Sequence, residues 1–141
     1  MIPSNLKYVL ESEPEKIAEW LEDKFTYEVP AKIETMEDME HVSELMSAIM
    51  NSYSYISNLT VRITIFCNSL KAECGIKPDA NASREEKEKY RKAKAEYEKM
   101  SLKRRILEQR QDILNKEYHC LSRKVTIKSN VDNELHMSDV H

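Results

Sequence analysis

Apolar side chains recur every seven residues along two long stretches of this chain, and this repeat constrains the fold more than any other feature. In the first stretch the two apolar heptad positions are filled by Met39, Met46, Tyr53, Thr60, Cys67 and Cys74, and by Val42, Ile49, Ile56, Ile63 and Leu70. The second stretch keeps the repeat at Ala93, Met100, Leu107, Leu114 and Leu121. A sustained seven-residue repeat is typical of long α-helices that pair along an apolar seam.

The scarcity of turn-forming residues excludes most alternatives to a helical fold. The chain of 141 residues has one glycine and four prolines, whereas a β-rich fold of this length needs many tight turns. Gly75 and Pro78 lie between the two heptad stretches, and Gly75 is placed to cap the end of the first helix. Thr35 and Ser83, each followed by acidic residues, predict the two helix starts. We therefore expect an all-α fold built on a long antiparallel, coiled-coil-like hairpin.

The hairpin is expected to span residues 35–128, with helices at 35–74 and 83–128 and a turn at 75–82. An acidic helical segment, 1–34, precedes it, and its helix ends before Pro30. That segment places Ile17 and Leu21 on one face and is expected to dock near one end of the hairpin. After residue 128 the repeat stops, so 129–141 is expected to be a loosely held polar tail.

The repeat also predicts which residues meet in the seam and which remain uncovered. The residues expected to form the seam of the hairpin or oligomer are Met46, Ile49, Tyr53, Ile56, Ile63, Cys67, Leu107, Leu114 and Leu121. Arg104 and Gln111 also fall in the seam, opposite Thr60 and Tyr53, where polar residues usually fix the register. Further apolar rows occur at Leu45, Leu59 and Phe66, and at Ile106, Ile113, Cys120 and Ile127. A lone hairpin cannot cover these rows, so we expect a homo-oligomer.

The sequence shows no feature of a membrane-spanning, secreted or metal-binding protein. It has no run of about 18 apolar residues and no basic-then-apolar leader, so neither a membrane span nor a secretory signal is expected. The three cysteines form no Cys-x-x-Cys pair, which favours reduced thiols in a cytoplasmic protein. His119 and Cys120 are adjacent, and adjacent residues on a helix point in different directions. We expect no metal site.

Catalytic motifs are absent as well. There is no glycine-rich phosphate loop and no strand–turn–helix nucleophile motif. The many carboxylates of the N-terminal segment lie on a helix without an apolar pocket that would raise their pKa. We therefore expect no enzyme activity, no catalytic residue and no cofactor.

Charge is distributed very unevenly along the chain. Residues 1–83 carry 7 Lys and Arg against 14 Asp and Glu, whereas residues 84–128 carry 15 against 8. A basic helix of this kind can bind phosphates without sequence specificity. The candidate nucleic-acid-binding residues are Lys99, Lys103, Arg104, Arg105, Arg110, Arg123, Lys124 and Lys128. An equally weighted alternative is that the acidic first half of the chain neutralises this helix.

The end of the basic helix resembles a known family. Arg123, Val125, Ile127, Lys128 and Val131 match the C-terminal signature of UvsY-type phage recombination mediators, and the order of acidic segment, long helix, loop and basic helix is similar. The family's Tyr-Tyr-Ser/Thr-Gly feature is replaced here by residues 72–75, and Val125 stands where the family usually has an aromatic residue. The resemblance implies an oligomer that binds single-stranded DNA and helps to load a recombinase by displacing a single-strand-binding protein.

These observations support three functional hypotheses. The first is a non-enzymatic, single-stranded-DNA-binding accessory protein, such as a phage recombination mediator in the bacterial cytoplasm. The second is a small phage inhibitor that binds a host protein through its acidic half. The third is a purely structural coiled-coil assembly subunit.

Overall fold

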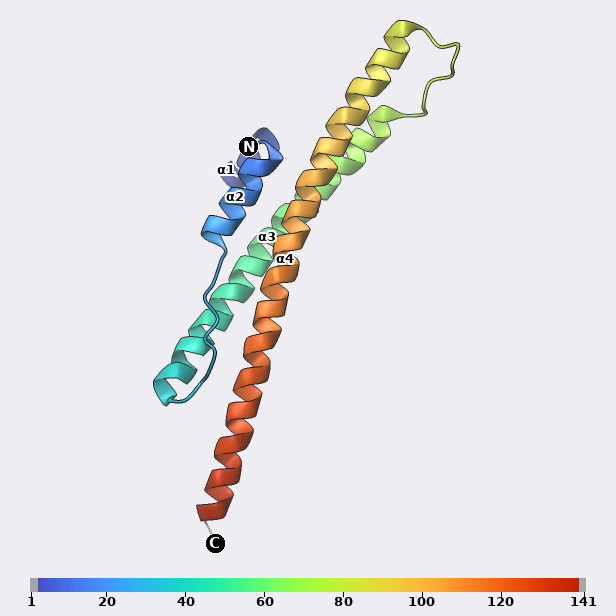
Figure 1. The fold of residues 1–141 in the computed structure, drawn as a ribbon. Helices are drawn as coiled ribbons and strands as arrows, with labels where there is room; N and C mark the ends of the chain where they lie inside the picture. The colour runs from blue at the N-terminus through green and yellow to red at the C-terminus, as the bar shows by residue number, and fades with distance from the viewer. Residues whose placement is uncertain (1–2, 140–141) are drawn as a thin grey trace.

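The computed structural model describes residues 3–139, with side chains through Leu135. Within these residues the chain forms α1 (Ser4–Glu11), α2 (Pro14–Lys24), α3 (Met36–Cys74) and α4 (Arg84–Asp139), and no strand. Helices α3 and α4 run antiparallel and pack closely together, with α1 and α2 alongside them (Figure 1). The expected all-α fold with a long helical hairpin is confirmed.

Capping residues fix both helices of the hairpin. At the start of α3 the backbone N–H of Asp38 donates to Thr35 Oγ1 at 3.0 Å, and the backbone N–H of Thr35 donates to Asp38 Oδ2 at 3.0 Å. The backbone N–H groups of Glu34 and Thr35, which both donate to the Asp38 carboxylate, hold the pKa of this carboxyl below its usual value. Gly75 ends α3 with a φ of 64°, in the left-handed region that favours glycine. Ser83 Oγ accepts the backbone N–H of Glu86 at 3.1 Å, as expected of an N-terminal cap.

The seam between α3 and α4 is apolar, with one half-buried polar cross-link. Of the residues expected in the seam, all are buried except Met46 and Tyr53, which are half-buried. Thr60 Oγ1 and Gln111 Oε1 lie 2.7 Å apart across the seam, and the Thr60 hydroxyl also lies 2.8 Å from the carbonyl of Ile56. Because polar groups in a seam are satisfied in one alignment only, this pair fixes the register of the hairpin.

The N-terminal arm, which we define as residues 3–35, covers one side of the hairpin. It contributes Leu6, Val9, Ile17, Leu21 and Phe25 to a core shared with the hairpin. The arm covers part of the additional apolar row on α3, because Leu59 lies beside Leu6 and is 2% exposed. Leu59 therefore needs no second chain to bury it.

The place where the arm docks differs from the prediction. It does not dock at one end of the hairpin but lies along the middle of α4, from Lys99, which contacts Glu13, to Lys124, which contacts Pro30. A segment rich in apolar residues buries most surface along the length of a helix pair, where both helices supply partners. The extended stretch between α2 and α3 runs along the hairpin for the same reason (Figure 1).

Helix α4 is longer than expected. It continues to Asp139, so its predicted end at 128 is wrong and residues 129–139 are helical rather than a loose tail; residues 140 and 141 of that segment lie outside the described residues. No glycine or proline follows residue 84, so nothing in the sequence interrupts the helix. Lys128 Nζ also lies 3.0 Å from Asp132 Oδ1, an i,i+4 ion pair that supports this last part.

Candidate nucleic-acid interface

Three of the predicted nucleic-acid-binding lysines bind the N-terminal arm instead. Lys99 Nζ donates to Glu13 Oε1 at 2.7 Å, Lys103 Nζ to the Leu10 carbonyl at 2.8 Å, and Lys124 Nζ to the Pro30 carbonyl at 2.7 Å. Each lysine therefore ties α4 to a different point of the arm. The structure assigns these residues to holding the arm in place.

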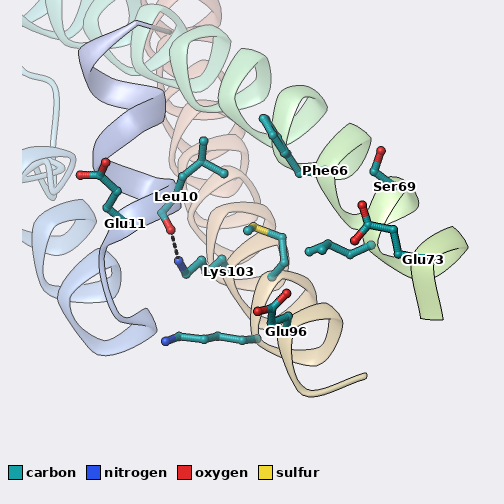
Figure 2. A pocket seen from close by; sticks show the side chains of 10 residues that line it. Leu10, Glu11, Phe66, Ser69, Glu73, Glu96 and Lys103 are labelled. Atoms are coloured by element: carbon teal, nitrogen blue, oxygen red, sulfur yellow. Dashed lines mark hydrogen bonds between the residues drawn. The ribbon is translucent and has the colours of Figure 1, made fainter. Parts of the chain in front are cut away.

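Lys103 is the clearest of the three, because its side chain is buried. Only 3% of the residue is exposed, and its amine points at the last turn of α1 (Figure 2). The final carbonyls of a helix lack partners within that helix, and a lysine amine is a suitable cap for them. Burial, reinforced by the nearby charge of Lys99, lowers the pKa of Lys103, whereas the charge of Glu13 opposes the change.

The Lys99–Glu13 ion pair lies closer to solvent. The hydrogen bond from Lys99, followed by its charge, lowers the pKa of the Glu13 carboxyl. Both side chains are about half exposed, so water and salt screen the pair. At this one point a carboxylate of the acidic first half neutralises a lysine of the basic helix, which is the kind of pairing that the alternative interpretation of the charge pattern expects.

The half-buried members of the predicted set also have acidic neighbours on α4. Arg104 Nε lies 3.8 Å from Glu108 Oε1 and makes no hydrogen bond, and Lys128 pairs with Asp132. The charge of Arg110 acts on Glu117, whose pKa is raised by burial and partly lowered again by that charge. Each of these three residues therefore has a carboxylate of its own helix nearby, which offsets part of its charge.

Arg105 and Arg123 differ from the rest of the predicted set, since both are exposed and neither forms an ion pair within the described residues. Lys94 and Lys116, which the sequence-based prediction did not include, are also exposed. The four residues are separated by 11, 11 and 7 positions, which correspond to whole numbers of helical turns. They therefore share one face of α4, which we call the outer basic row: Lys94, Arg105, Lys116 and Arg123.

Two carboxylates interrupt the outer basic row. Glu98 lies 4.0 Å from Lys94, and Asp112 occupies the same face between Arg105 and Lys116. The row is therefore basic on balance but not continuous. A spacing of 7 and 11 is visible in the sequence, so the missed residues could have been found by sorting the basic residues by helix face rather than by local density.

The cavity beside Lys103 does not suit a phosphate group. It has a volume of about 450 Å³ and lies between the end of α1, the last turns of α3 and the facing part of α4 (Figure 2). Its charged lining consists of the carboxylates Glu11, Glu73 and Glu96 against the amines of Lys99 and Lys103. Because both amines already have partners, the carboxylates dominate and would repel a nucleic-acid backbone.

Other classes of site receive no support from the described part of the chain. Among the side chains of residues 3–135, no three from His, Cys, Asp or Glu are grouped so that they could hold a metal ion. The described helices include none that is long and apolar enough to cross a membrane. Among the cysteines, Cys67 is buried, which raises the pKa of its thiol, Cys74 is half-buried and Cys120 is exposed.

Comparison with known proteins gives no further direction. No family model, no curated protein and no solved structure matches this chain.

Proposed function

We propose that this protein is a non-enzymatic accessory protein that binds single-stranded DNA through the outer basic row of α4. One observation carries the proposal: four basic side chains lie exposed on one helix face, clear of the lysines that hold the N-terminal arm. The row extends over about 44 Å, since the helix rises about 1.5 Å per residue. Such an arrangement suits a chain of phosphates better than a compact ligand.

The chemistry of the row favours contact with the nucleic-acid backbone over contact with bases. Lysine and arginine bind phosphate oxygens and release counterions, and this gives affinity without sequence preference. Tyr97 and Tyr118, the aromatic residues that could have stacked on bases, are half-buried and pack against the core. Binding is therefore expected to depend steeply on salt and weakly on sequence.

The preference for single strands and the mediator role rest on the resemblance to UvsY-type proteins. The segment that carries it, residues 123–131, begins with Arg123, a member of the outer basic row. Ile127 and Val131 in the same segment are 57% and 45% exposed, so they are available for contact with another protein. In this role the chain would help to load a recombinase and displace a single-strand-binding protein.

The experiment is fluorescence anisotropy of a labelled single-stranded oligonucleotide of about 30 nucleotides across a salt series, with duplex DNA for comparison. If each residue of the row contacts one phosphate, the logarithm of the binding constant falls with that of salt with a slope of about −2.8, at about −0.7 per contact. The triple variant R105Q/K116Q/R123Q is expected to lower the magnitude of this slope by about 2, with unchanged helicity.

The matched control is K7Q/K24Q/K32Q, which removes the same net charge from exposed residues outside α4. It is expected to leave the salt slope within error of the wild-type value. Equal losses in the two triple variants would mean that net charge alone drives binding, and the row would not be the site. No binding to either strand form at low salt would refute the proposal.

A second candidate is protein binding through the acidic side of α2. Glu15, Glu19 and Glu22 are exposed and spaced so that they share a face of that helix. A row of carboxylates suits a basic protein surface, as in the inhibitor hypothesis. An oligomer that binds neither DNA nor a basic partner would favour the third hypothesis, a structural assembly subunit.

A further inference from the structure

The exposed side of α3 lacks the charges that a water-facing helix normally carries. Between Glu44 and Lys71 the only charged residue is Arg62, in a chain of which 33% is charged. Over the same length of hairpin, the exposed side of α4 is densely charged. We define the α3 outer face as the exposed residues that share this side of the helix: Ser47, Met50, Ser54, Asn58, Val61, Ile65 and Asn68.

The apolar residues of this face are substantially exposed to solvent. Val61 is 58% exposed, Ile65 is 62% exposed and Met50 is 36% exposed. The other members are serine and asparagine, which are small enough to let a second helix approach closely. Loss of charge around apolar residues is typical of the centre of a protein–protein interface rather than of a solvated surface.

Neither α4 nor the N-terminal arm covers this face. Helix α4 packs on the opposite side, where Ile56 and Ile63 are fully buried. Helix α1 reaches only its edge, at Arg62 and Asn58, through Pro3, Asn5 and Leu6. Apart from this edge at Asn58, the α3 outer face is open.

We propose that the α3 outer face pairs antiparallel with the same face of a second copy of this chain. With the two-fold axis between residues 57 and 58, Met50 lies opposite Ile65 of the second copy, and Val61 lies opposite its Ser54. Large side chains thus meet small or apolar ones throughout, so the face is complementary to itself. A two-fold interface uses the same surface of both copies and therefore requires such self-complementarity.

Charge selects the antiparallel arrangement and a second copy as the partner. The start of α3 carries Glu37, Asp38, Glu40 and Glu44, and its end carries Lys71 and Glu73, whose charges cancel. Parallel pairing would place the acidic starts together, whereas antiparallel pairing separates them, puts Lys71 opposite Glu44 of the second copy and also opposes the helix dipoles. Nucleic acid would find no basic residue on this face and only Arg62 at its edge. The outer basic row lies on a different helix, so this dimer leaves it exposed.

The test is sedimentation equilibrium of the full chain and of the variant V61E/I65E. The wild type is expected at twice the monomer mass of 16.6 kDa, and the variant at the monomer mass. The matched control is I127E, which replaces the apolar residue on α4 that is 57% exposed. This control is expected to remain dimeric. A wild-type monomer, or loss of the dimer in I127E alone, would overturn the proposal.

Thermal unfolding separates loss of an interface from damage to the fold. In a monomer, glutamate in place of exposed valine and isoleucine improves helix propensity, so Tm would stay equal or rise slightly. In the proposed dimer, Tm of the wild type rises with protein concentration, whereas Tm of V61E/I65E is lower and independent of it. A concentration-independent wild-type Tm that the double substitution does not lower would contradict the pairing.

Cross-linking tests the register. In the proposed pairing the two copies of residue 58 face each other near the two-fold axis, so Asn58→Cys in a C120S background is expected to form a disulfide-linked dimer on oxidation. Ser43→Cys in the same background, which lies far from the axis, is expected to remain uncross-linked. Efficient cross-linking at residue 43 and none at residue 58 would refute the antiparallel register.

Discussion

Lys103 and Arg105 are two residues apart on one basic helix, and the structure predicts opposite consequences of replacing them. The change to test is Lys103→Met, which keeps the unbranched stem in its buried position and removes only the amine that binds the Leu10 carbonyl. A hydrogen bond from a charged group is worth about 1.5–3 kcal/mol, and Met recovers part of that by avoiding the burial of a charge. We expect a net loss of about 1–2 kcal/mol in the free energy of unfolding.

The loss should be concentrated in the N-terminal arm, because Lys103 caps the last turn of α1. Hydrogen exchange of the α1 and α2 amides is the direct assay, since it reports local opening. A loss of about 1–2 kcal/mol corresponds to exchange about 5–30 times faster. The amides of the α3–α4 seam, such as those around Leu114, should change less.

Arg105→Met is the matched control, because Arg105 is exposed and forms no ion pair within the described residues. Its effect on stability should stay within about 0.5 kcal/mol, whereas its salt slope for DNA should fall by about 0.7. For Lys103→Met we expect the reverse, namely a clear loss of stability and an unchanged salt slope for DNA. If the two variants are equally stable and α1 exchanges at the wild-type rate in both, the cap contributes nothing and the reasoning is refuted.

The lowered pKa of Lys103 gives a second, independent test, which is the pH dependence of stability. Burial lowers its folded-state pKa below the unfolded value, so between the two values the unfolded chain binds more protons. Wild-type stability should therefore rise with pH through that window. The Lys103→Met variant lacks this contribution, so the stability difference between the two proteins should depend on pH within that window.

Two further substitutions test other parts of the structure. Gly75→Ala should lower the free energy of unfolding, measured by chemical denaturation, by about 1–3 kcal/mol, because the backbone there has φ 64° and ψ −145°. No neighbouring atom lies within 4 Å of the new methyl group, so this cost comes from the backbone alone. An unchanged midpoint would show that the helix end can rearrange. Glu117→Gln should raise stability at neutral pH, because burial raises the pKa of this carboxyl and one of its oxygens is buried without a hydrogen-bond partner. The stability gain from Glu117→Gln is complete above the folded-state pKa of Glu117 and should vanish as pH falls below the unfolded-state pKa. A gain that persists in acid would contradict this account.

The hairpin was predictable from the sequence because its determinants are local or periodic. The heptad repeat identifies Leu107 and Leu114 as seam residues, and one glycine in the whole chain marks the turn at Gly75. Thr35 and Ser83 carry cap signals that the structure bears out. Even the Thr60–Gln111 contact follows from the repeat, since antiparallel pairing opposes those positions.

The path of the N-terminal arm was not predictable from the same signals. Its helices are too short for a repeat, and the carbonyls of Leu10 and Pro30 that bind lysines are backbone groups with no sequence signature. The end of α4 was misplaced for a different reason. Loss of the apolar repeat after residue 128 signals loss of packing, but a helix without glycine or proline can continue beyond its partner.

The assignment of Lys103 shows how charge density misleads where periodicity would not. Lys103 is four residues before Leu107 and eleven before Leu114, so helical spacing places it on the buried stripe. A lysine in that position must either reach solvent or find an acceptor, and the Leu10 carbonyl is that acceptor. Arg105, two residues later, points about 160° away from Lys103 around the helix, toward solvent. The face on which a basic residue lies, rather than the number of basic residues nearby, therefore separates those that can meet a phosphate from those that hold the fold together.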